Sequence, residues 1–322
     1  MNYKPILIVH GEPNSIFLEI FFKSIKHRRF KNPLILICSQ KILKFQMKKL
    51  NFKMGIKILD PSLLNEIDLN NKTINIIDIN YNKDLTFKKN TSKSNSYIKD
   101  CFETSFKILK SGITNKFING PISKDSFLNK KFLGITEYLA KKTEASQNAM
   151  LIYNKKLSVC PVTTHLPLKK VVKKKTKKKI KEKIILINSF YQKYLGFKPK
   201  IAVLGINPHC ESIDKFNEDE KIIKPTIKYL SKKKINVKGP YSADTAFLKK
   251  NRNNIDVIVG MYHDQVLTPI KTLYEYDAIN ITLGLPFFRI SPDHGPNQEM
   301  LGQNKSNPLS LVRAIEFLEK NW

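Results

Sequence analysis

Long apolar runs, paired cysteines and glycine-rich phosphate loops are all missing from this 322-residue sequence. No stretch approaches the roughly 20 apolar residues of a transmembrane helix, and glycine and proline break the opening run MNYKPILIVHGEP too early for a signal peptide. The four cysteines form no CxxC pair, so we expect reduced thiols in a cytoplasmic protein with no membrane partner. The 12 glycines form neither GxGxxG nor GxxxxGKS/T, which excludes an ordinary Rossmann fingerprint or P-loop.

Arginine is also scarce, although the formal net charge is +30, so the positive charge is almost entirely lysine. The lysine surplus comes with abundant isoleucine and asparagine, a composition typical of AT-rich codon usage. The densest lysine run is VVKKKTKKKIKEKIILINSFY, residues 171–191. We expect this run to form a helix whose lysines face solvent, with an anion-binding surface as the alternative. The inward residues of that helix would be Val172, Thr176, Ile180, Ile184, Ile187 and Tyr191. No zinc-finger spacing or aromatic RNA-binding motif accompanies the charge, so we expect no nucleic-acid partner.

Short apolar runs alternate with amphipathic stretches, which predicts an α/β fold with a parallel sheet and helices on both faces. The expected strands are 5–9, 33–38, 116–120, 157–162, 200–205, 256–260 and 278–284. The expected helices include 15–27, 97–111, 169–195 and 218–234. In such folds ligands bind at the carboxyl ends of the strands, so the residues that follow each run are the first candidates for a site.

Three of the six histidines, His165, His209 and His263, each follow one of three consecutive expected strands. Their spacings of 44 and 54 residues do not suit a local zinc knuckle, but they suit neighbouring βα units whose strand ends meet. Three imidazoles without cysteine would leave coordination positions open, as in catalytic Zn²⁺, Co²⁺ or Mn²⁺ sites. The pattern therefore favours a catalytic metal site.

The alternative is that each histidine is an ordinary hydrogen-bonded residue. We prefer that interpretation for His10 and His27, which lie outside the pattern. Asp264, beside His263, would either hold a neighbouring imidazole or cap the helix that follows.

Six motifs occur in order between Gly11 and Gly302: GEP, TTHLPL, GINPH, GPYSADTAF, MYHDQVLTPIK and INITLGLPFFRISPDHG. Together they resemble the 4-hydroxythreonine-4-phosphate dehydrogenase family of vitamin B6 biosynthesis. The resemblance implies a two-domain α/β/α fold like that of isocitrate and isopropylmalate dehydrogenases, with a cleft between the domains. The cofactor-side domain would comprise 1–125 plus 276–322, and the metal- and substrate-side domain 126–275.

The resemblance also implies an activity, the NAD-dependent oxidation and decarboxylation of 4-phosphohydroxy-L-threonine to 3-amino-2-oxopropyl phosphate by a homodimer with a shared active site. One divalent metal per site (Zn, Co, Mn or Mg) would be bound by His165, His209 and His263, one of them supplied by the partner subunit. The residues implied for substrate binding are Thr136, Lys271, Asn280 and Arg289. The implied catalytic or orienting carboxylates are Asp244 and Asp264, and the implied cofactor residues are His294, Gly295, Asn297 and Glu299.

Ordinary roles remain open for three of these residues. Lys271 would then be a surface amine, Arg289 a salt-bridge residue and Asp244 a helix cap.

The sequence departs from the family pattern at three places. Ile135 stands in GITE where the family has a histidine that contacts substrate, so a sister activity on threonate or erythronate 4-phosphate is the alternative function. NPHCES replaces the family's NPHAGE. DHGPNQEMLG replaces DHGTAxDxxG, which leaves the choice between NAD and NADP open.

Overall fold

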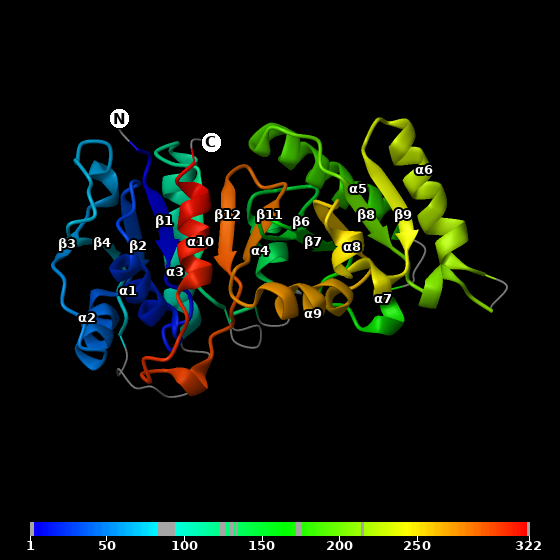
Figure 1. The fold of residues 1–322 in the computed structure, drawn as a ribbon. Coiled ribbons are helices and arrows are strands. Elements are labelled where there is room, and N and C mark those ends of the chain that lie inside the picture. Colours follow the sequence, from blue (N-terminus) through cyan, green and yellow to red (C-terminus); the bar gives the residue numbers. More distant parts are fainter. Residues whose placement is uncertain are drawn as a thin grey trace. The chain divides into compact units, whose positions relative to one another are not determined.

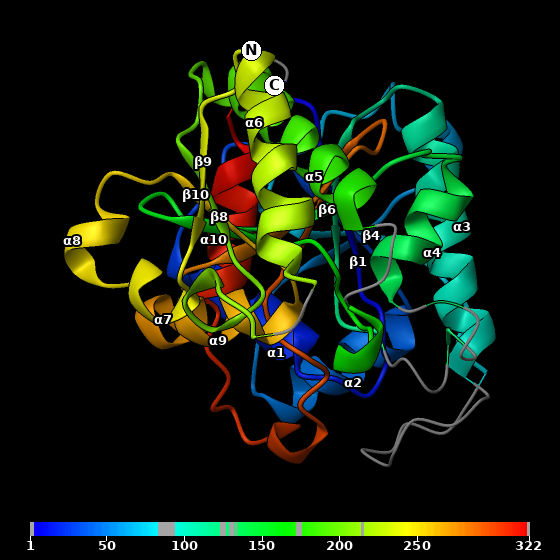
Figure 2. The same cartoon turned by 90° about the vertical axis from the view of Figure 1, so that its right-hand side faces the viewer.

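The computed structural model describes residues 3–82, 94–122, 127–128, 132, 134–171, 176–213 and 216–320. The chain separates into unit 1, Met1–Ile135 with Pro286–Trp322, and unit 2, Thr136–Leu285. Figure 1 labels most elements of both units, and Figure 2 labels β10. No described helix is both long and apolar enough to cross a membrane.

The strands are β1 (Ile6–Val9), β2 (Leu34–Cys38), β3 (Ile56–Ile58), β4 (Ile74–Asp78), β5 (Lys116–Asn119), β6 (Ala149–Tyr153), β7 (Ser158–Pro161), β8 (Ile201–Leu204), β9 (Val237–Tyr241), β10 (Val257–Gly260), β11 (Ile279–Leu283) and β12 (Phe288–Pro292). The α-helices are α1 (Phe17–His27), α2 (Gln40–Lys49), α3 (Asn95–Lys110), α4 (Ile135–Lys142), α5 (Thr176–Phe190), α6 (Lys224–Lys232), α7 (Ala243–Ala246), α8 (Lys249–Arg252), α9 (His263–Tyr274) and α10 (Leu309–Leu318). All of the expected strands are present, each within one residue of its expected ends.

The sheet of unit 1 has the strand order β3-β4-β2-β1-β5-β12, and its paired strands run parallel. Strands β1, β2 and β5 are buried along their whole length, as expected for a parallel sheet covered on both faces. Helix α10 packs on β12, whereas α3 packs on β1 and β2. These two helices lie on opposite faces of the sheet (Figure 1, Figure 2).

The sheet of unit 2 has the strand order β11-β6-β7-β10-β8-β9. Strand β10 pairs in parallel with both β7 and β8, but β6 runs antiparallel to β11 and to β7. The expectation of a wholly parallel sheet was therefore wrong in this unit. Only residues 154–157 connect β6 to β7, and so short a connection makes a hairpin, because a parallel crossover needs a dozen or more residues.

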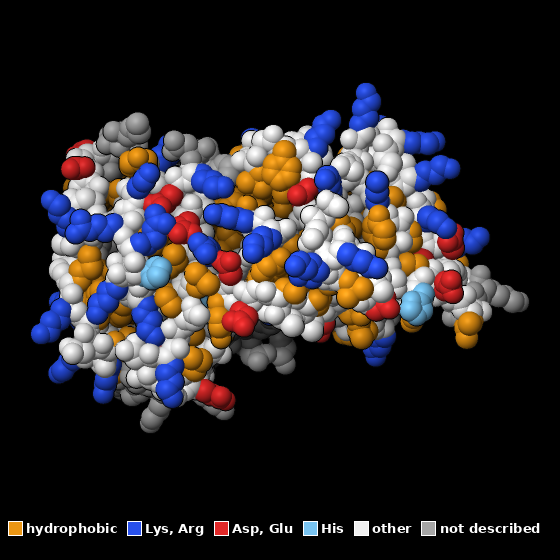
Figure 3. All heavy atoms as spheres, viewed as in Figure 1, with side chains coloured by type: hydrophobic (Ala, Val, Ile, Leu, Met, Phe, Trp, Pro, Cys, Tyr) orange, Lys and Arg blue, Asp and Glu red, His pale blue; other side chains and the backbone are white. Residues whose placement is uncertain are grey.

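The lysine-rich helix α5 turns its apolar side inward. Ile180, Ile184 and Ile187 are completely buried, whereas Lys177 and Lys178 are exposed. Lys183 is an exception, because its amine donates to the carbonyl of Asn148 and burial lowers its pKa. The expected solvent-facing lysines are confirmed, apart from residues 172–175, which lie outside the described residues. Lysine and arginine side chains are spread over the face shown in Figure 3.

The boundaries between the two units fall ten residues later in the sequence than expected, after residues 135 and 285 instead of after 125 and 275. The second difference has a clear structural reason. Strand β11 is fully paired with β6, from Ile279 opposite Tyr153 to Leu283 opposite Ala149. This pairing brings 276–285 into unit 2.

Gly284 ends β11 in a conformation that only glycine adopts easily. Its φ is +90°, and a Cβ atom there would lie 2.3 Å from the carbonyl oxygen of Gln147. We expect Gly284→Ala to lower the free energy of unfolding by about 1–3 kcal/mol more than Gly196→Ala. Gly196 is the matched control, since its φ is +79° and nothing lies within 4 Å of its Cβ position. Urea unfolding of both variants measures the difference, and equal losses would show that the contact with Gln147 is harmless.

Candidate active site

The carboxyl ends of β7, β10 and β8 lie at one edge of the unit 2 sheet, because β10 pairs in parallel with both neighbours. His165 follows β7, His209 follows β8, and His263 is the first residue of α9 after β10. The three histidine-bearing βα units are therefore neighbours, as the spacing predicted.

His165 and His263 lie together at this edge. Their ring centroids are 5.8 Å apart, with 37° between the ring planes. Nδ1 of His263 is hydrogen-bonded to Oδ1 of Asp264 at 2.6 Å, which leaves Nε2 as the nitrogen available to a ligand. Among the described residues, Tyr262 at the N-terminal end of α9 makes no side-chain capping hydrogen bond. Asp264 thus contacts the imidazole and does not cap the helix.

His209 lies on the short turn Pro208–Cys210, with its side chain 73% exposed. His209 has φ +54° and Cys210 has φ +64°, and this left-handed conformation costs a residue with a side chain about 1–2 kcal/mol. Nδ1 of His209 lies 3.4 Å from Oγ of Ser242 and 3.9 Å from Oδ2 of Asp244. The Ser242 hydroxyl donates to Oδ1 of Asp244 at 2.5 Å, and this bond holds the pKa of the carboxyl below its usual value.

The donors fit a divalent metal in their chemistry. His263 and His209 each have Nδ1 beside a carboxylate, the arrangement that orients Nε2 of metal-binding histidines. Within the described residues of one chain, however, no three His, Cys, Asp or Glu side chains form a group that could hold a metal. One chain brings His165 to His263 and His209 to Asp244, and it leaves these two pairs as separate groups.

The GITE motif begins α4 and is connected to the His165 loop. Thr136 is buried, and the hydroxyl of Thr164 donates to Oε1 of Glu137 at 3.1 Å. Sequence reasoning missed Glu137, because nothing in the pattern showed that α4 lies against the residue before His165.

Lys271 and Asn280, the other two substrate residues expected in unit 2, lie on different elements. Lys271 is exposed in the last turn of α9, eight residues after His263. Asn280 is half-buried on β11, and its Oδ1 is buried without a hydrogen-bond partner among the described residues. A buried acceptor of this kind is one that a ligand could satisfy.

Arg289, the fourth expected substrate residue, belongs to unit 1. It lies on β12 and is completely buried. Its Nε donates to Oδ1 of Asn119 at the end of β5, at 2.7 Å. Asn119 in turn donates to the carbonyl of Gly120 at 2.8 Å. The guanidinium is thus held in one orientation by the end of the neighbouring strand.

The expected cofactor residues follow β12 in unit 1 and pack against Ile16 and Phe17, at the start of α1 after the GEP loop. The ring of His294 stacks on Phe17 with centroids 6.4 Å apart, and the backbone N–H of Ile16 donates to the carbonyl of Pro296 at 3.2 Å. Gly295, Asn297 and Glu299 are exposed in the same loop. Since β1, β5 and β12 are adjacent strands, this loop and the GEP loop lie at their carboxyl ends, where α/β sheets bind ligands.

His10 has an ordinary structural role. It is completely buried, its Nδ1 lies 3.1 Å from the hydroxyl of Tyr97, and desolvation lowers its pKa to about 3. The imidazole is therefore neutral at physiological pH.

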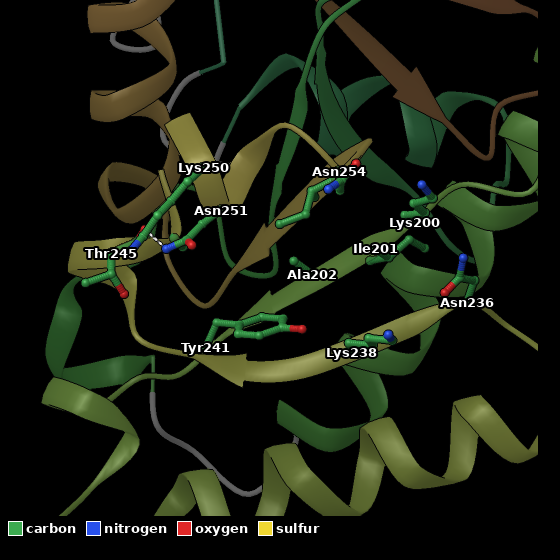
Figure 4. A pocket seen from close by; sticks show the side chains of 12 residues that line it. Lys200, Ile201, Ala202, Asn236, Lys238, Tyr241, Thr245, Lys250, Asn251 and Asn254 are labelled. Atoms are coloured by element: carbon green, nitrogen blue, oxygen red, sulfur yellow. Dashed lines mark hydrogen bonds between the residues drawn. The ribbon is translucent and has the colours of Figure 1, made fainter. Parts of the chain in front are cut away.

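A cavity of about 550 Å³ opens elsewhere on unit 2, beside β8, β9 and α8 (Figure 4). Its lining includes Lys200, Lys238, Tyr241, Thr245 and Asn254, and none of the expected site residues. Its lysines do not distinguish it, because the chain has 57 lysines and arginines in all. We therefore place the candidate site at the histidine-bearing strand ends.

Comparison with known proteins shows the family of the chain. The chain matches the family of the pyridoxal phosphate biosynthetic protein PdxA over residues 29–318. The 4-hydroxythreonine-4-phosphate dehydrogenase of Sulfurihydrogenibium sp. (strain YO3AOP1) is 36% identical over 317 residues, which cover 97% of this chain and 96% of that protein. The D-threonate 4-phosphate dehydrogenase of Pectobacterium atrosepticum is 30% identical over 322 residues, which cover 98% of each.

Solved structures share the fold. The 4-hydroxythreonine-4-phosphate dehydrogenase of Klebsiella pneumoniae has a TM-score of 0.83 at 28% identity and covers 98% of this chain and 97% of its own. A β-decarboxylating dehydrogenase of Thermococcus kodakarensis has a TM-score of 0.51 at 10% identity over 97% of this chain and 81% of its own, a likeness of fold alone. The expected α/β fold class, shared with a β-decarboxylating dehydrogenase, is confirmed. With its motifs in order and a family match over nearly its whole length, the chain belongs to the PdxA family of pyridoxal phosphate biosynthesis.

Proposed function

We propose that the protein is a metal- and NAD-dependent dehydrogenase that oxidises the 3-hydroxyl of 4-phosphohydroxy-L-threonine and releases CO₂, giving 3-amino-2-oxopropyl phosphate. The observation that carries the proposal is the position of three histidines at neighbouring strand ends, with His165 and His263 only 5.8 Å apart between ring centroids. Membership of the PdxA family supports the same activity.

His165, His263 and the partner subunit's His209 would hold the metal in a homodimer. His209 is the histidine assigned to the second chain, because it is exposed and lies with Asp244 instead of with the other pair. When bound, the metal supplies a Lewis acid beside the substrate hydroxyl, and NAD⁺ supplies the hydride acceptor. Asp264 orients the His263 ring through its hydrogen bond to Nδ1.

The remaining residues bind and orient the substrate. Lys271 and Arg289 supply positive charge for its carboxylate and phosphate, and Asn280 and Thr136 supply hydrogen-bonding groups. Fixing both anionic ends orients the reacting C–H bond. The cofactor, NAD or NADP, would be contacted by four residues of the loop after β12: His294, Gly295, Asn297 and Glu299.

A second substrate class is favoured by one feature of this chain. Ile135, half-buried at the start of α4, stands where the family has a histidine. An isoleucine cannot donate a hydrogen bond to phosphate, and a relative of this chain is a D-threonate 4-phosphate dehydrogenase. The alternative is therefore oxidation of a threonate or erythronate 4-phosphate at the same metal site.

A substrate panel distinguishes the two proposals. We expect kcat/KM for 4-phosphohydroxy-L-threonine to exceed that for D-threonate or D-erythronate 4-phosphate by about tenfold or more. The first substrate carries an ammonium group at C2 where the two sugar acids carry a hydroxyl, and one such contact is worth about 1–3 kcal/mol. NADH absorbance measures the rates, and parallel reactions with NADP⁺ decide the cofactor. A preference for a sugar-acid phosphate would establish the alternative.

The metal proposal predicts that His263→Ala loses nearly all turnover and retains its fold, because an open catalytic site contributes little to folding. Metal analysis after dialysis should find no bound ion in the variant, and circular dichroism should match the wild type. His27→Ala, at the end of α1 in unit 1, is the control and should keep full activity. Chelator should inactivate the wild type, and added Zn²⁺, Co²⁺ or Mn²⁺ should restore it. Wild-type activity in His263→Ala would contradict the mechanism.

Arg289→Lys tests the role of the buried guanidinium. The variant keeps the charge and loses the planar guanidinium that can donate two parallel hydrogen bonds. We therefore expect a fall in kcat/KM that corresponds to a loss of about 2–3 kcal/mol in transition-state stabilisation. Arg313→Lys, at a partly exposed pair with Glu316, should change it little. The loss should shrink for a substrate analogue without the anionic group that Arg289 binds. Equal losses with every truncated analogue would show that Arg289 only supports the fold.

A further inference from the structure

Asp219 is a carboxylate at the start of the π-helical turn Asp219–Ile223 that precedes α6, and it is completely buried. It accepts three hydrogen bonds from the loop that follows β8. The backbone N–H of Ile206 donates to Oδ1 at 2.9 Å, and the backbone and side-chain N–H groups of Asn207 donate to Oδ2 at 3.1 and 3.0 Å. Both carboxylate oxygens are therefore committed to the two residues that lead into Pro208 and His209.

The loop is packed tightly around this carboxylate. A Cβ atom at Gly205 would lie 2.7 Å from Oδ1 of Asp219 and 2.6 Å from Sγ of Cys210. Both His209 and Cys210 have positive φ angles. A residue with a side chain keeps such a conformation only where its surroundings enforce it, and the bonds to Asp219 are made by the two residues that precede this turn.

Gln265 connects the start of the same loop to the His263 turn. Its Nε2 donates to the carbonyl of Gly205 at 2.7 Å, and its Oε1 accepts from the backbone N–H of Met261 at 2.6 Å. The ends of β8 and β10 are thereby joined through one side chain of α9. The His209 loop thus has a connection to the neighbouring histidine-bearing strand in addition to the bonds of Asp219.

We propose that Asp219 is a positioning residue for the metal site: its buried carboxylate fixes the turn that carries His209, so that the imidazole is presented to the ion. The inference rests on the proposed function, because it assumes that His209 is a metal ligand. A carboxylate is a stronger hydrogen-bond acceptor for N–H groups than a neutral oxygen, and metal ligands must be held within about 0.5 Å to bind well.

Asp219→Asn is the direct test. An asparagine amide has only one acceptor oxygen, so its NH₂ group would face one set of donors from the loop. We expect the Kd for Co²⁺, measured on the intact protein by competition with a chromophoric chelator, to rise about 10–100-fold. The visible absorption spectrum of the bound Co²⁺ should change as well, since it reports the geometry of the ligands. Glu220→Gln is the matched control, since it removes the same charge from the next residue, an exposed carboxylate paired with Lys224 at 2.6 Å.

Asn207→Ala covers the case in which Asp219→Asn does not fold. It removes the side-chain bonds to Asp219 and Glu218 and keeps the backbone bond to Asp219, so the Kd for Co²⁺ should rise about threefold to tenfold.

A folded Asp219→Asn, or an Asn207→Ala variant, with the wild-type Kd and spectrum overturns the proposal. If the wild-type protein itself binds no Co²⁺, the proposed metal-dependent function fails together with this inference. Co²⁺ binding by the wild type with unchanged variants makes the inference alone fail.

Discussion

The parallel pairing of β10 with β7 and β8 is the constraint on which the candidate site depends. Parallel strands all run in the same direction, so the residues that follow them gather at the same end of the sheet, the end where the strands have their carboxyl termini. In this chain the three strands are separated in sequence by long crossover segments, and each is followed by a histidine. The backbone hydrogen bonds of the sheet therefore place histidines that are 44 and 54 residues apart at the same end of the sheet, where His165 lies with His263 and His209 lies with Asp244.

Strand pairing alone does not orient side chains on the loops that follow, and buried polar groups supply that second level of order. Gln265 connects the ends of β8 and β10, and Asp219 holds the turn before His209. In unit 1, Asn119 holds Arg289 in the same way. Each bond satisfies a buried donor or acceptor that would otherwise cost about 1–3 kcal/mol. The loops are thus specified by polar contacts, whereas the strands are specified by apolar burial.

Some residues of the site could be expected from their local pattern, and others could not. Histidines after apolar runs pointed to the strand ends, because the period and length of the runs predicted parallel strands. Asp264 was recognisable as a partner of His263 because the two are adjacent in sequence. Asp219 and Glu137 carried no such signal, since each contacts a loop that is distant in sequence and no local pattern records that proximity.

The sequence by itself determined seven of the strands, the solvent-facing lysines of α5, the strand-end histidines and, through its ordered motifs, the family. These features depend on which residue types follow one another over a short stretch of sequence. Burial of the apolar residues in such a stretch stabilises the strand or helix that the pattern predicts. Only the tertiary structure decided that β6 runs antiparallel, that residues 276–285 belong to unit 2, and that His209 lies with Asp244 while His165 lies with His263. The pairing of β6 with β11 and the contacts of the histidines join segments that are far apart in the chain, so no local pattern of residues records them.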